Sequence, residues 1–130
     1  MQEFVTGADI SKDAYRFTDG SGLSRGTVVS PAAIIKLLAY MYKSSNRDLW
    51  MSMLPIAGVD GTLASRFQDH AEAQTIRAKT GSLSHIRSMS GYAKTSRYGP
   101  VAFSFLVNNF AAPTVEVSRF LDRIGLVLLE

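Results

Sequence analysis

Cysteine is absent from the 130 residues of the sequence. This absence rules out disulfide bonds, thiolate metal sites and cysteine nucleophiles. A His-Glu-x-x-His motif or a comparable ligand cluster is also missing, so we expect neither a metal nor a cofactor. His70 and His85 would have to meet a serine and an aspartate to form a catalytic triad, and only geometry can decide that.

The sequence also lacks long runs of basic residues and long runs of apolar residues. The 14 basic residues are scattered among 11 acidic ones, which gives a formal charge of +3 without a Lys/Arg run. This pattern is typical of a solvated surface, so we expect no nucleic-acid partner. No apolar run approaches the ~18 residues of a membrane span. The first residues lack the basic start of a signal peptide, so we expect no export signal or membrane span in the chain as written.

The length and the 46% hydrophobic content suit one sizeable core and are too small for two ordinary domains. We therefore expect a single unit over residues 1–130. Ser30-Pro31 forms a helix N-cap and first helical residue, and the apolar residues that follow at helical spacing predict a helix over 31–43. Shorter helices are expected over 47–54, before Pro55, and over 60–68.

Three strands are predicted over 75–79, 88–95 and 101–110, the last two joined as a hairpin. Residues 101–107 are apolar on both faces, which predicts a central strand covered on each side. Pro113 begins a terminal helix, and its predicted apolar stripe comprises Val117, Phe120, Leu121, Ile124 and Leu128. Consecutive strands joined by short turns favour an antiparallel sheet. The predicted fold class is therefore α/β of the α+β type, with helices packed against that sheet.

The tripeptide Lys79-Thr80-Gly81, followed by Ser82, stands at the end of the first predicted strand. Alone it is short enough to arise by chance, as a lysine at a strand end before a Thr-Gly turn. Three further blocks accompany it: Asp-Gly-Ser-Gly-Leu-Ser-Arg at 19–25, the Ser-Pro-capped helix, and Met-Leu-Pro-Ile-Ala-Gly-Val-Asp-Gly-Thr-Leu at 53–63. In this order the four blocks resemble the C-terminal part of D-alanyl-D-alanine carboxypeptidases of the DacB type, the S13 peptidase family. The resemblance extends from about Phe17 to the C-terminus.

The resemblance implies the fold of serine β-lactamases and penicillin-binding proteins, an antiparallel sheet packed between helices. It also implies catalytic roles for Lys79, as a positive charge beside the nucleophile and the substrate carboxylate, and for Ser82, whose backbone N–H would be an oxyanion donor. Thr80 and Gly81 would bind substrate, Thr80 through its hydroxyl group and Gly81 by letting the substrate backbone approach the strand.

The block at 19–25 is implied to run near the cleft, where Leu23 and Arg25 would contact the peptide side chain of peptidoglycan. An arginine suits a carboxylate. A purely structural turn, with Arg25 paired to a neighbouring acid, is an alternative that the sequence leaves open. The block at 53–63 is interpreted as scaffold for the cleft strand, with Asp60 as a helix cap.

One part of the family pattern is missing. These enzymes carry their nucleophile in a Ser-x-x-Lys motif and commonly add a Ser-x-Asn. The sequence contains no Ser-x-x-Lys, and Ser44-Ser45-Asn46 lies at a helix end and outside the family order. Its hydroxyl and amide groups are interpreted as helix-terminal polarity.

The leading hypothesis is a C-terminal fragment of a serine-type D-Ala-D-Ala carboxypeptidase or endopeptidase of the periplasm or cell envelope. By resemblance its partners are peptidoglycan stem peptides, β-lactams and the missing upstream half of the domain, and alone it should be inactive. A fragment would expose an unpaired sheet edge and an apolar helix face. We expect these to be covered either by a companion segment or in a homo-oligomer. Two alternatives remain: a non-catalytic peptidoglycan- or partner-binding module with the same half-fold, and an unrelated domain in which Lys79 lies away from any cleft.

Overall fold

A three-stranded antiparallel sheet forms the centre of the structure, a computed structural model that describes residues 2–130. The strand order is β3-β4-β5, so that β4 is central and the two others are edges. The strands are β3 (Arg77–Leu83), β4 (Ile86–Thr95) and β5 (Gly99–Asn108). In the register, Thr80 lies opposite Met89 and Met89 opposite Phe105.

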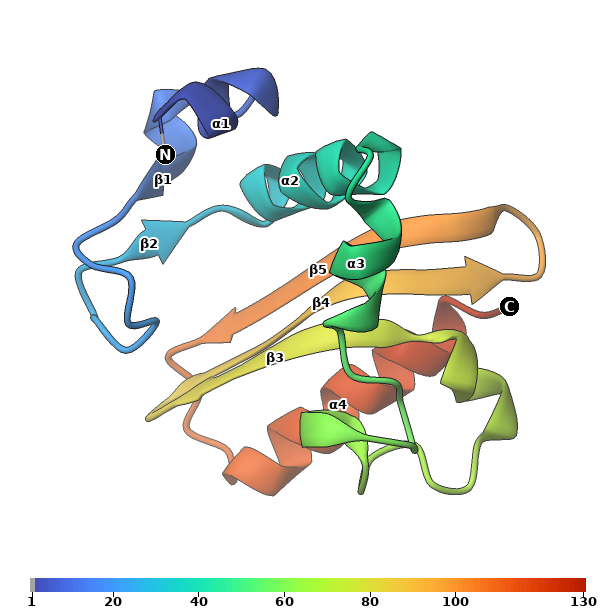
Figure 1. Ribbon diagram of the computed structural model, residues 1–130. Coiled ribbons are helices and arrows are strands. Elements are labelled where there is room, and N and C mark those ends of the chain that lie inside the picture. Colours follow the sequence, from blue (N-terminus) through green and yellow to red (C-terminus); the bar gives the residue numbers. More distant parts are fainter. Residues whose placement is uncertain (1) are drawn as a thin grey trace.

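Helices cover both faces of this sheet (Figure 1). α2 (Pro31–Lys43) and α3 (Arg47–Ser52) lie over one face, and α4 (Thr114–Val127) lies over the other. This arrangement confirms the predicted antiparallel sheet between helices. The cap of α2 is also confirmed, because the Ser30 hydroxyl accepts a hydrogen bond from the Ala33 N–H at 3.2 Å.

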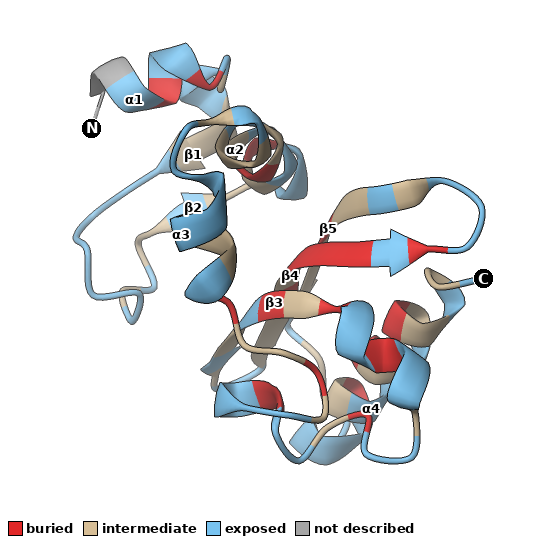
Figure 2. Cartoon of the chain, turned by 45° about the vertical axis from the view of Figure 1, so that its right-hand side comes forward, coloured by how far each residue is buried: buried red, intermediate tan, exposed pale blue. Residues whose placement is uncertain are grey.

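The N-terminal part forms a separate small layer that the sequence did not predict. It consists of α1 (Gln2–Gly7), a 3₁₀ turn η1 (Lys12–Ala14), and the strands β1 (Tyr15–Arg16) and β2 (Val28–Val29). The two short strands pair with each other and belong to a sheet of their own. The loop 17–27 joins them and lies outside the main sheet in Figure 1 and in Figure 2.

The main core lies between the sheet and α4. Its fully buried members include Leu63, Ile76, Met89 and Leu121. Figure 2 shows the buried segments gathered on β3, β4 and α4, whereas the layer of α1 to α3 is mostly intermediate or exposed. A smaller cluster of Leu38, Leu54 and Tyr92 lies on the α2 side.

The prediction of a helix over 60–68 is wrong. Only η2 (Gly61–Leu63) forms there, as a 3₁₀ turn, and the chain then turns irregularly. Phe67 has φ of 60°, a left-handed conformation that interrupts a helix. Its buried ring packs over Gly125 of α4, so tertiary contact overrides local helix preference. Asp60 does not cap η2 with its side chain, because its carboxylate accepts the Ile56 N–H at 2.6 Å.

The strand boundaries also differ from those predicted. Thr75 ends the 3₁₀ turn η3 (Ala71–Thr75), and β3 then continues to Leu83, so Lys79-Thr80-Gly81 lies within the strand and not at its end. The turn that follows includes His85, which has φ of 58°, and β4 begins at Ile86. The strand expected to be central, β5, is an edge strand within residues 2–130.

The terminal helix is confirmed, with one error in its apolar stripe. Val117 and Leu121 are buried, but Phe120 is 49% exposed. Gly125 is buried in its place against Phe67. The packing of the loop before β3 onto α4 therefore sets which side of the helix faces the core.

Candidate functional site

The outer edge of β3 is open along the part that carries the tripeptide. Before it, the edge is occupied, because the Ala78 N–H donates to the Pro55 carbonyl at 3.0 Å and the Ala57 N–H to the Ile76 carbonyl at 3.1 Å. In an antiparallel strand, the N–H groups of alternate residues point to the same side. The N–H groups of Thr80 and Ser82 therefore point to the outer edge, where no other strand of residues 2–130 pairs.

Lys79 brings a positive charge to this same edge. Its side chain is exposed, and its ammonium group donates a hydrogen bond to the Thr80 carbonyl oxygen. That carbonyl points to the outer edge together with the Thr80 N–H. The ammonium group thus lies over the open side of the strand, where an anionic ligand can approach it.

Two hydroxyl groups flank the tripeptide. The Thr80 hydroxyl donates to the hydroxyl of Thr62, in η2, at 2.8 Å. Ser88 lies opposite Gly81 in β4, and a Cβ atom built on Gly81 would come within 2.3 Å of the Ser88 Oγ. The glycine therefore makes room for the Ser88 hydroxyl. The resemblance implied a different reason for a glycine here, the close approach of substrate.

Lys79, Thr80 and Ser88 also line a groove of about 480 Å³ between the sheet and the layer of α2 and α3. Ser90 extends the polar floor, and its hydroxyl lies 2.9 Å from that of Ser104. The other wall is apolar and comprises Val29, Ile34, Leu37, Leu38, Trp50, Met53 and Leu54, and Leu106 of β5, opposite Ser88, adds an apolar side chain on the sheet side. Lys79 thus lies in a cleft, contrary to the alternative of an unrelated domain.

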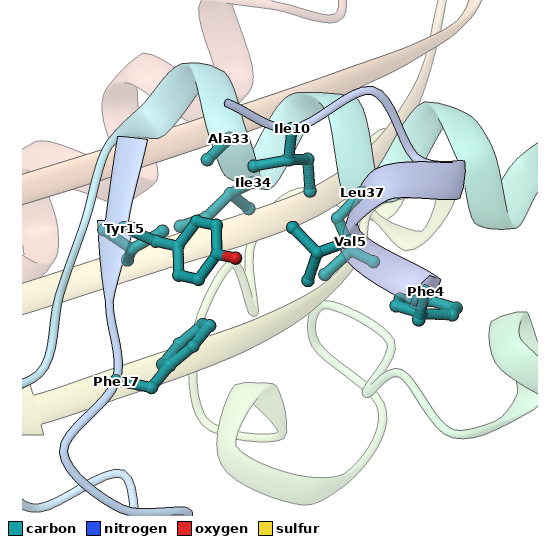
Figure 3. A pocket seen from close by; sticks show the side chains of 9 residues that line it. Phe4, Val5, Ile10, Tyr15, Phe17, Ala33, Ile34 and Leu37 are labelled. Atoms are coloured by element: carbon teal, nitrogen blue, oxygen red, sulfur yellow. The ribbon is translucent and has the colours of Figure 1, made fainter. Parts of the chain in front are cut away.

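The apolar wall continues into a second pocket, of about 370 Å³, under the N-terminal layer (Figure 3). Three residues, Val29, Ile34 and Leu37, line both. In Figure 3 Ile34 and Leu37 of α2 face Val5 of α1 and Tyr15 of β1 across this pocket. The groove and the pocket together form one extended apolar surface along α2.

The loop 17–27 carries Leu23 and Arg25 on its exposed side, and neither residue lines the groove. The loop is fixed at its start, because the Asp19 carboxylate accepts from the hydroxyl of Ser21 at 2.6 Å and from its N–H at 2.9 Å. These hydrogen bonds lower the pKa of Asp19 below its ordinary value. Leu23 is 68% exposed, and among the described residues Arg25 has no ion pair. The pairing of Arg25 with a neighbouring acid is therefore not observed.

The remaining candidates lie elsewhere. His70 contacts the Glu72 carboxylate at 2.9 Å, and the His85 Nδ1 lies 2.9 Å from the Phe110 carbonyl oxygen. Neither histidine lines the groove. Within residues 2–130, no three His, Asp or Glu side chains gather as a metal site would require, and no helix has the length and apolar character to cross a membrane.

Sequence reasoning missed Thr62 and Ser88. Thr62 lies in the block 53–63, which was interpreted as scaffold only, and 18 residues separate it from Thr80. Ser88 follows from the register of β3 and β4, and the predicted strand over 75–79 ended before Gly81, which pairs with it. Correct strand ends would have identified Ser88, but no local signal identifies Thr62.

Comparison with known proteins gives consistent matches. Residues 1–122 match the model of the D-Ala-D-Ala carboxypeptidase 3 (S13) family. The D-alanyl-D-alanine carboxypeptidase of Actinomadura sp. (strain R39) is 33% identical over 118 residues, 87% of this chain and 22% of the relative. D-alanyl-D-alanine carboxypeptidase DacB of Haemophilus influenzae is 33% identical over 114 residues, 82% of this chain and 24% of the relative.

Solved structures agree with the sequence matches. The crystal structure of penicillin binding protein 4 (dacB) from H. influenzae, complexed with a β-lactam, aligns with a TM-score of 0.85 and 28% identity, over 99% of this chain and 32% of that one. A peptidoglycan endopeptidase from Bdellovibrio bacteriovorus has the same fold, with a TM-score of 0.76 and 19% identity over 98% of this chain and 35% of that one. The chain thus spans about a quarter of the length of the curated relatives and about a third of the solved chains.

Proposed function

The chain belongs to the D-Ala-D-Ala carboxypeptidase 3 (S13) family, and on that premise we propose that it is the substrate-binding, C-terminal part of a serine-type carboxypeptidase or endopeptidase that acts on peptidoglycan stem peptides. One observation carries the proposal. The Lys79 ammonium and the outward N–H groups of Thr80 and Ser82 lie at the open outer edge of β3 beside the groove, and the Thr80 hydroxyl, bonded to Thr62, belongs to the same strand.

Each group has a role in this reaction. The Lys79 charge attracts the terminal carboxylate of the D-Ala-D-Ala peptide, and the Thr80 hydroxyl donates a hydrogen bond to it. The outward N–H of Ser82 stabilises the oxyanion that forms when the scissile carbonyl is attacked. Loss of one such donor costs about 3 kcal/mol of transition-state stabilisation in enzymes of this kind.

The nucleophile has to come from outside these 130 residues, because no Ser-x-x-Lys is present. We propose that the upstream half of the domain supplies it and covers the extended apolar surface along α2. The outer edge of β5 supports this, since among residues 2–130 this strand pairs with β4 alone and its other edge is free to pair. The upstream half would add its strands there.

Two further assignments follow from the family. By resemblance to the family, Leu23 and Arg25, which are exposed on the loop 17–27, would contact the peptide side chain of peptidoglycan. β-lactams should bind at the same edge, as the H. influenzae relative was crystallised with one. The substrate places the protein in the periplasm or cell envelope.

Carboxylate recognition can be tested on the chain itself. An acetylated peptide ending in D-Ala-D-Ala should shift the NMR amide signals of Thr80 and Ser82 more than the same peptide with a C-terminal amide. Lys79→Met keeps the length of the side chain and removes its charge, so it should abolish the difference. Equal shifts from the two peptides with the unsubstituted chain would refute the proposed site.

The missing nucleophile can be tested with a fluorescent penicillin. We expect no covalent labelling of the 130-residue chain, and labelling of H. influenzae DacB in the same gel. A labelled band from the isolated chain would show that it holds a nucleophile of its own. Size-exclusion chromatography adds an independent check, because the exposed apolar surface should cause the isolated chain to self-associate.

A further inference from the structure

The hydroxyl group of Thr62 lies 2.8 Å from that of Thr80, and Thr80 is the donor. A hydroxyl group has one hydrogen to donate and two lone pairs to accept with. The bond therefore uses the hydrogen of Thr80 and leaves that of Thr62 available. For Thr80 to donate to a carboxylate, it has to turn its hydrogen away from Thr62.

We propose that Thr62 is a positioning residue for carboxylate binding, an inference that rests on the proposed function. When the carboxylate arrives, Thr80 donates to it, and Thr62 in turn donates its own hydrogen to the Thr80 oxygen. Thr80 thus keeps a hydrogen bond to Thr62 in both states. Hydrogen bonds in a chain polarise one another, so this arrangement makes Thr80 a stronger donor toward the anion.

The backbone around Thr62 is fixed well enough for this role. The next residue, Leu63, is fully buried, its N–H donates to the Asp60 carbonyl at 3.2 Å, and its own carbonyl accepts from Gly58 at 3.0 Å. Gly61 has φ of 52°, and a Cβ atom there would come within 2.9 Å of Pro55. The turn that presents Thr62 therefore requires glycine at the preceding position.

The same segment is bonded to β3. Pro55 accepts from Ala78 at 3.0 Å and Ala57 donates to Ile76 at 3.1 Å, only a few residues from Thr62 and Thr80. This pairing fixes the position of η2 relative to the strand, so that the two hydroxyl groups stay opposite each other. Thr62 itself is exposed, which means that its hydroxyl group is not held there by burial in the core.

The test compares three substitutions in the peptide titration described above. Thr62→Val keeps the shape of the side chain and removes the hydroxyl group, whereas Thr62→Ser keeps the hydroxyl group. Thr75→Val is the matched control, since Thr75 is also exposed and its hydroxyl bonds to the Glu72 carbonyl, away from the groove. Thr62→Val should weaken binding of the carboxylate peptide about three- to tenfold.

The C-terminal amide peptide should bind all variants alike, and Thr62→Ser should retain most of the preference for the carboxylate. A loss that is equal for both peptides, or the same loss in Thr62→Ser, would show a merely structural role and overturn the inference. Unchanged carboxylate binding by Thr62→Val would overturn it too, while the proposed function stands. If the unsubstituted chain shows no preference for the carboxylate, the proposed function fails first and the role of Thr62 with it.

Discussion

The two faces of the sheet are built by the same three strands and yet differ in how complete they are. On the α4 face, the side chains of Ala78, Met89, Ala93 and Phe103 are buried in one continuous core. On the other face, the alternate residues Lys79, Ser88 and Ser90 line an open groove. Alternation along a strand sends neighbouring residues to opposite faces, so one short sequence builds a core and a candidate site at once.

The α4 face provides most of the buried core, whereas the α2 face carries the candidate site. All four of the largest fully buried side chains belong to the α4 face, and the loop before β3 is closed against α4 as well. The α2 face keeps only a small cluster beside the extended apolar surface. The α4 face is therefore complete within this chain, whereas we propose that the α2 face is completed by residues outside it.

The sharpest test of the contrast compares two leucines. Leu121 of α4 is 1% exposed, and Leu37 of α2 lines the open groove. Leu121→Ala should lower the free energy of unfolding by about 2–5 kcal/mol, because it opens a cavity in a closed core. Leu37→Ala should cost about 1 kcal/mol or less, as the site is already open. Urea denaturation followed by circular dichroism measures both, and equal losses would mean that the two faces do not differ.

An ion pair fixes the loop before β3 to α4. Arg66 donates to the Asp122 carboxylate, with 2.8 Å between its Nε and the Oδ1, and the two side chains are only 17% and 19% exposed. Asp122→Ala leaves the guanidinium group without its partner at a largely buried site, and we expect a loss of about 1.5–3 kcal/mol by urea denaturation. The control is Asp48→Ala, which removes an exposed carboxylate at the start of α3. Similar losses in both variants would contradict a specific role for the pair.

The sequence predicted which helices and strands form better than it predicted where they begin and end. Residues 31–43 form the helix expected from the Ser-Pro cap, because cap and periodicity are local properties. The end of β3 and the turn at Phe67 depend on partners far away in sequence, Ser88 and Gly125, and no local pattern reports them. For the site the same limit applies. Lys79 and Thr80 could be identified from their motif, but the direction of the Ser82 N–H follows from strand pairing alone.

Gly81 should also be sensitive to substitution. Gly81→Ala would place a methyl group 2.3 Å from the Ser88 Oγ if nothing moved, so the serine or the strand must shift. We expect a loss of about 1–3 kcal/mol in urea denaturation, typical of overpacking. Combining it with Ser88→Ala, which removes the obstructing hydroxyl group and keeps the Cβ atom at an ordinary contact distance, should restore much of the loss. If the double variant is no more stable than Gly81→Ala, the steric explanation is wrong.

The smallest effect is expected at Tyr92, a buried side chain of β4 whose hydroxyl group bonds to the α2 side. Its hydroxyl donates to the Leu38 carbonyl at 2.7 Å and accepts from the Trp50 Nε1 at 3.0 Å. Tyr92→Phe should cost about 1 kcal/mol of unfolding free energy at neutral pH.

Burial raises the pKa of Tyr92 above its ordinary value of 10.0. The unfolded chain therefore loses this proton first, and the stability is present below pH 10 and falls as the pH rises above it. Urea denaturation at pH 8 and pH 11 should show a smaller loss of stability in Tyr92→Phe than in the unsubstituted chain. An identical loss in both proteins would mean that deprotonation of Tyr92 does not cause the fall in stability above pH 10.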